Sequence, residues 1–107
     1  MKFAGTWHIY EMEQWDEEYF NMEVQAYIKV DSNGQGDFQF GLVRGFIDGE
    51  VVKIGEDDRL EFTWEGNDEM DEALGSGWVQ LKDKRTVEGR IKFHLGDSSC
   101  FLAKRAK

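Results

Sequence analysis

A run of carboxylates and aromatic rings between residues 11 and 19 holds the side chains best suited to chemistry in this chain. Glu11, Glu13 and Asp16 are interleaved with Trp15 and Tyr19. Neighbouring carboxylates can divide the work of a general acid and a general base when their surroundings separate their pKa values. Carboxylates beside aromatic rings can also select a cationic or sugar-like ligand. A solvated acidic loop is the third interpretation, and it implies no function.

The enzyme hypothesis rests on Glu11, Glu13 or Asp16 alone, because the sequence offers no other catalytic pattern. Ser98 lies in a turn without a Gly-x-Ser-x-Gly elbow, and Cys100 has no histidine or basic activator nearby in the sequence. No cofactor fingerprint accompanies the carboxylates. We therefore rank catalysis last and predict no cofactor.

Metal binding has similarly weak support. Residues 65–72 hold five carboxylates and an asparagine, but their spacing matches no calcium loop. Residues 31–36 resemble the start of an EF-hand loop, yet Leu42 stands where a bidentate glutamate is required. His8 and His94 alternate onto the outer face and form no ligand pair. We predict no metal site and interpret 31–36 as a hairpin turn.

Arg44 is the charged residue that a binding hypothesis must explain. If the strand that carries Phe40 keeps one register, Arg44 points into the apolar interior, where an unpaired charge is very costly. Two alternatives stay open. A bulge at Gly41 or Gly45 turns Arg44 outward, or a carboxylate, that of Glu11 or Glu13, pairs with it.

The second alternative defines a candidate ligand-binding set. Its members are Trp15, Phe40 and Trp64 as apolar contacts, with Glu13 and Arg44 as polar anchors. The inward-facing residues as a whole are bulky, and an eight-stranded barrel is only wide enough to be filled by its own side chains or to hold one small ligand. Fillers of this size favour a mostly packed interior.

The elements that would position these residues are strands, because apolar and polar residues alternate along most of the chain. The clearest run is 20–30, where the even-numbered positions from Phe20 to Val30 are apolar. Later strands are predicted from six inward-facing sets: Phe38, Phe40, Leu42 and Phe46; Val52 and Ile54; Leu60, Phe62 and Trp64; Val79 and Leu81; Val87, Gly89, Ile91 and Phe93; and Phe101, Ala103 and Arg105.

Glycine, asparagine and aspartate make the turns, because the chain has no proline. Turns are predicted at 31–36, 48–49, 55–58, 83–85 and 96–98, with a longer loop at 66–76 and one helical turn at 15–19. In the first strand, Trp7 and Ile9 set one buried face and Met12 sets the other. We therefore predict a bulge or sharp bend near Tyr10.

The opening residues Gly5-Thr6-Trp7 resemble the Gly-x-Trp entry motif of the calycins, the lipocalin-like small β-barrels. In those barrels the tryptophan plugs one end, and an arginine on the last strand lies across its ring. The eight predicted strands, joined mostly by short turns, predict an all-β, eight-stranded antiparallel up-and-down barrel, and the resemblance implies the same lipocalin-like fold. It further implies that Trp7 and Arg105 stack by a cation–π attraction of about 0.5–2 kcal/mol. The chain lacks the two-helix lid of fatty-acid-binding proteins and a helix after the barrel.

Charge and size narrow the possible partners, the location and the number of domains. Thirteen basic and 22 acidic residues give a formal net charge of −9, which argues against nucleic acid and anionic lipid as partners. No window approaches the roughly 18 apolar residues of a membrane span. The single Cys100 and the lack of an apolar signal region favour a cytoplasmic protein. We predict one domain spanning residues 1–107, with one hydrophobic core.

Two function hypotheses follow ahead of the enzyme. The first is a non-enzymatic binding protein for a small molecule of unknown class. The second is an interaction protein with a packed barrel that acts through its outer wall or as a homodimer. Trp78 and Tyr27 would serve the second hypothesis, because both are large aromatic side chains predicted to face outward.

Overall fold

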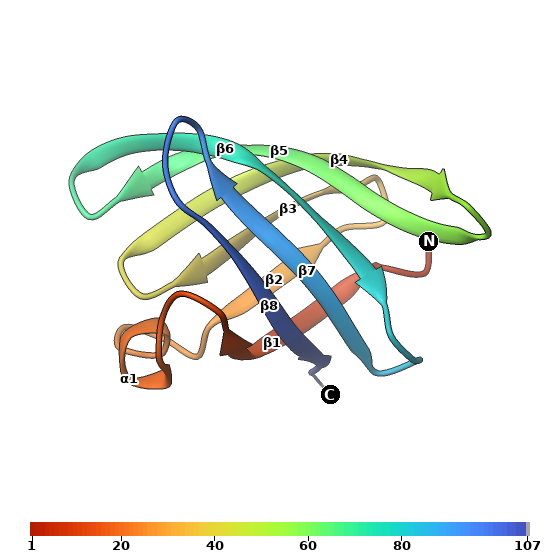
Figure 1. The fold of residues 1–107 in the computed structure, drawn as a ribbon, viewed down its shortest axis with the longest axis horizontal. Helices are drawn as coiled ribbons and strands as arrows, with labels where there is room; N and C mark the ends of the chain where they lie inside the picture. Colours follow the sequence, from red (N-terminus) through yellow and green to blue (C-terminus); the bar gives the residue numbers. More distant parts are fainter. Residues whose placement is uncertain (107) are drawn as a thin grey trace.

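Eight antiparallel strands follow one another around a closed barrel, as the alternation predicts (Figure 1). The computed structural model describes residues 1–106. Its elements are β1 (Gly5–Met12), α1 (Glu17–Phe20), β2 (Tyr27–Val30), β3 (Gln35–Phe40), β4 (Val43–Ile54), β5 (Asp57–Asp68), β6 (Asp71–Leu81), β7 (Thr86–Phe93) and β8 (Ser98–Arg105). Each strand pairs with the next, and β8 closes the barrel on β1. Closure removes the exposed strand edges that would otherwise invite aggregation.

The predicted change of face in the first strand is confirmed. The register between β1 and β8 shifts between Ile9 and Glu11, so Tyr10 is the extra residue of a bulge. Ile9 and Met12 are both buried, although they lie on opposite faces of a regular strand. The bulge therefore lets β1 supply apolar side chains to the core along its whole length.

One end of the barrel is closed as the resemblance implies. The guanidinium carbon of Arg105 lies 4.0 Å from the centroid of the Trp7 ring. Arg105 also donates hydrogen bonds to the carbonyl oxygens of Ala4, at 3.0 Å, and Lys2, at 3.3 Å. Gly5 has a φ of +125°, and a Cβ there would lie only 3.1 Å from an Arg105 nitrogen. The glycine of the entry motif thus leaves room for the arginine that covers the tryptophan.

The predicted strand at 20–30 is wrong in its first half. Asp16 caps a short helix by accepting a hydrogen bond from the backbone N–H of Tyr19 at 3.1 Å, so α1 takes up residues 17–20. This places the single helical turn slightly later than the predicted 15–19. Met22 and Val24 are exposed in the connection that follows, and only residues 27–30 form β2.

The turn predicted at 48–49 is also wrong. The chain reverses instead at Gly41, whose φ of +55° favours glycine. A Cβ at Gly41 would lie 2.3 Å from the ring of Tyr19, so α1 packs where only glycine fits. The residues around Gly49 continue through β4 as one strand, and Phe46 is 65% exposed instead of buried.

The predicted loop at 66–76 is paired strand. β5 and β6 stay hydrogen-bonded until Asp68 faces Asp71, so only two residues form the hairpin turn. Glu69 adopts a φ of +60° there. Gly66 and Gly75 in this segment, and Gly77 just beyond it, each lie in a strand where a Cβ would approach a cross-strand carbonyl oxygen within 2.3 Å.

Candidate functional site

Three of the five predicted ligand-binding residues meet inside the barrel near α1. The rings of Trp15 and Phe40 have centroids 5.0 Å apart. Phe38 packs on Phe40 at 5.9 Å and on Trp64 at 5.1 Å. The sequence therefore identified residues that lie together, but the rings contact one another, and Phe38, Phe40 and Trp64 are at most 3% exposed.

Trp64 also makes contacts with β7 that fix its position in this cluster. Its ring stacks edge-on against Phe93 with centroids 5.2 Å apart. Its indole N–H donates to the carbonyl oxygen of Lys92 at 3.2 Å. Trp15, which is half-buried, lies 6.3 Å from Phe93 and closes the cluster on the side of α1. The barrel is thus filled at this end by its own aromatic rings.

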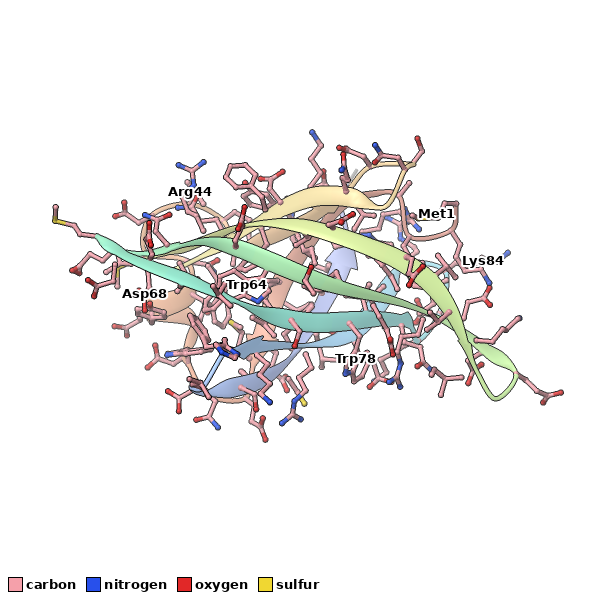
Figure 2. All side chains as sticks on the ribbon, turned by 90° about the horizontal axis from the view of Figure 1, so that it is seen from above. Met1, Arg44, Trp64, Asp68, Trp78 and Lys84 are labelled. Carbon is pink, nitrogen blue, oxygen red and sulfur yellow. The ribbon has the colours of Figure 1, made fainter. Side chains whose placement is uncertain are left out.

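The two polar anchors lie elsewhere. Arg44 is exposed on β4, and its side chain points away from the barrel in Figure 2. Arg44 is turned outward, as the first alternative expected, but by a hairpin turn at Gly41 and not by a bulge at Gly41 or Gly45. Glu13 is exposed just beyond β1, where its carboxylate accepts a hydrogen bond from the backbone N–H of Cys100 at 3.3 Å. Neither residue reaches the aromatic cluster.

The three carboxylates of the enzyme hypothesis are all exposed, and one of them stabilises the short helix. Asp16 caps α1, and Glu11 and Glu13 are exposed beside β8. Within residues 1–106, no group of three or more His, Cys, Asp and Glu side chains is arranged to hold a metal ion.

Tyr27 lies on the outer face of β2, where its hydroxyl donates a hydrogen bond to Asp37 at 2.5 Å. Partial burial, together with this hydrogen bond, raises the pKa of Tyr27 to about 12. Because the neutral phenol is favoured by folding, its stabilising effect is complete below pH 10, the usual tyrosine value, and is lost as the pH rises to about 12.

We therefore expect the free energy of unfolding, measured by urea titration, to fall between pH 10 and pH 12. Tyr27→Phe should make that fall shallower, and Tyr10→Phe, on an exposed tyrosine, should leave it unchanged. Equal slopes for all three proteins would contradict the assignment.

A hollow of about 700 Å³ lies on the outer face of β4–β7. Figure 2 looks onto this side of the barrel, with Trp78 labelled. β4 and β5 bring three carboxylates to the hollow, those of Asp48, Glu50 and Glu61, and β7 brings the cations Arg90 and Lys92. One wall is therefore acidic and the opposite wall is basic. We call this surface the β4–β7 face.

Trp78 is held in place on this face by a neighbour. The guanidinium carbon of Arg59 lies 4.0 Å from the centroid of the Trp78 ring. Arg59 is oriented by two hydrogen bonds to the side-chain oxygen of Gln80, at 3.2 and 3.1 Å. The outward direction predicted for Trp78 is confirmed by its partly exposed position in the hollow. An aromatic ring held by a stacked cation is a rigid contact surface for a partner.

Sequence reasoning missed the charged residues of the β4–β7 face. Alternation does place Glu50, Glu61, Arg90 and Lys92 on the outside, so the outward direction of each residue was predictable. Their grouping depends on which residues face each other across four strands, and this requires the register.

The fold defines an all-β protein with a closed eight-stranded antiparallel barrel, an architecture compatible with the calycins. No family model, curated protein or solved structure matches the chain. Among residues 1–106, no helix has the length and apolar character needed to cross a membrane.

Proposed function

We propose that this protein is a non-catalytic binding module that acts through the β4–β7 face, with the filled barrel as its scaffold. The observation that carries this proposal is the contrast between interior and exterior. Trp15, Phe40 and Trp64 occupy the interior position that a ligand would need, whereas the outer face has a hollow with an aromatic ring and charges of both signs.

This proposal keeps the lipocalin-like shape and gives up the central ligand cavity. A small molecule could enter beside α1 only if the Trp15 ring moved off Phe40 and Phe93. Burying aromatic surface stabilises a protein by roughly 25 cal/mol per Å², so a ligand would have to replace contacts that the folded chain already makes. An outer face needs no such rearrangement. We further propose a cytoplasmic location, where the exposed thiol of Cys100 would stay reduced.

Site-specific photo-cross-linking in cells tests the proposal. A photoreactive amino acid at Thr63 sits among the residues that line the hollow, and one at Lys29 is exposed on β2, away from the hollow. We expect discrete cross-linked products from position 63 and none of the same size from position 29. An absence of products at position 63, or the same products at both positions, would contradict binding through this face.

A further inference from the structure

The charges of the β4–β7 face are arranged so that the face is complementary to a second copy of itself. Two rows of outward-facing residues cross the four strands in register. The first row is Asp48, Thr63, Ser76 and Lys92, and the second is Glu50, Glu61, Trp78 and Arg90. In each row a carboxylate stands on β4 and a cation stands on β7. The charge of each row therefore reverses from one side of the face to the other.

A second copy of the same face is complementary to this arrangement. A two-fold axis that lies between the two copies, parallel to the strands and midway between β5 and β6, exchanges β4 with β7 and β5 with β6. It brings Asp48 opposite Lys92 of the second copy and Glu50 opposite Arg90 of the second copy. The symmetry repeats both pairs, so four ion pairs form.

The sizes of the side chains fit the same geometry. The centre of the first row has the small residues Thr63 and Ser76, whereas the second row brings Glu61 opposite Trp78 of the second copy. The hollow lies over this centre, and the long charged side chains of β4 and β7 form its two walls. These side chains are the first to meet those of a second copy. Arg90 already donates to the hydroxyl of Ser98 at 2.7 Å and to the sulfur of Cys100 at 3.7 Å, but a guanidinium has five N–H donors, so others are available to a second copy.

We propose that the protein forms a two-fold symmetric dimer through the β4–β7 face, with Glu50–Arg90 and Asp48–Lys92 pairs between the copies. This inference rests on the proposed function and names the partner as a second copy of the chain. The four strands pair in common over five residues each, at positions 47–51, 60–64, 75–79 and 89–93, so the shared surface is about 17 Å long and about 14 Å wide. A contact of that size buries on the order of 500 Å² in total, which is below a standard stable interface and predicts a weak dimer that dissociates on dilution.

A charge-exchange experiment tests the pairing. In E50R both copies present arginine to Arg90, and in R90E both copies present glutamate to Glu50, so each variant alone should lose the dimer. A one-to-one mixture of E50R and R90E restores opposite charges at both Glu50–Arg90 contacts of a mixed dimer. Sedimentation velocity over a range of concentrations measures the dimer, and native mass spectrometry identifies its composition.

We expect wild-type protein to dimerise, each single variant to dissociate at a concentration at least about tenfold higher, and the mixture to recover the dimer as a mixed species. The control K29E, on the opposite wall, should behave as wild type. Should R90E fail to fold, D48K and K92D provide the same exchange in the other row.

Three outcomes overturn the dimer: a wild-type protein that stays monomeric at high concentration, single variants that dimerise as wild type does, or a mixture that stays monomeric. A monomeric wild type whose position 63 still cross-links to other proteins would refute the dimer alone. A position 63 that cross-links to nothing would refute the proposed function as well.

Discussion

Replacing Trp7 by alanine is expected to lower the free energy of unfolding by about 3–5 kcal/mol, as large-to-small changes of buried aromatic residues do. The Trp7 side chain is 1% exposed, and its indole N–H donates to the carbonyl oxygen of Phe3 at 2.9 Å. Its removal leaves a cavity and takes away the ring on which Arg105 stacks. A loss of this size is a large share of the roughly 5–15 kcal/mol that keeps a domain folded. Urea titration followed by circular dichroism measures the effect.

Two control measurements separate the contribution of the hydrogen bond to Phe3 from that of the stack with Arg105. Trp7→Phe keeps a ring in the barrel end and loses the hydrogen bond to Phe3, a loss of about 1 kcal/mol, in addition to some packing. A double-mutant cycle with Arg105→Ala should give a coupling of about 0.5–2 kcal/mol for the stacked pair. If Trp7→Ala proved no more destabilising than Trp7→Phe, the tryptophan would not be the plug of the barrel.

Gly75→Ala is expected to destabilise the protein by about 3 kcal/mol, at the upper end of the usual cost of overpacking. An added Cβ would lie 1.8 Å from the carbonyl oxygen of Lys92 and 2.9 Å from the indole nitrogen of Trp64. That carbonyl accepts the Trp64 hydrogen bond, so separating β6 from β7 also disturbs the aromatic cluster. Thermal and urea unfolding would show the loss, and a change in tryptophan fluorescence should accompany it.

The matched control for Gly75→Ala is Ser76→Ala, one residue later on β6. Ser76 is exposed on the outer face, so its replacement should change stability by no more than about 0.5 kcal/mol. Similar effects of the two substitutions would mean that the strands are farther apart at Gly75 than the structure places them.

The strands were predictable because each has one buried face, and alternation reports this directly. The bulge at Tyr10 was predictable for the same reason, since the apolar residues on its two sides lie on opposite faces of a regular strand. The turns were less predictable. Asp48-Gly49 has the composition of a hairpin turn, but Gly49 is needed inside β4, where a Cβ would lie 3.0 Å from the Cβ of Phe62. Such close approaches depend on tertiary packing, which local composition does not report.

The candidate site was predictable as a group of residues but not as a geometry. Trp15, Phe40 and Trp64 were expected to converge, and they do. Whether converging rings line a cavity or fill it depends on the tilt and register of the strands, which the sequence does not specify. The β4–β7 face depends on register even more strongly, because a carboxylate on β4 and a cation on β7 meet in one row only when three strand pairings are known.

Native mass spectrometry of protein purified gently from cells tests most directly whether the barrel interior is filled and binding takes place on the outer face. A filled barrel predicts the mass of the bare chain in the monomer and twice that mass in any dimer, with no additional small molecule. A monomer that carries extra mass in the native spectrum, and loses it on denaturation, would contradict a filled interior by showing that the barrel holds a ligand.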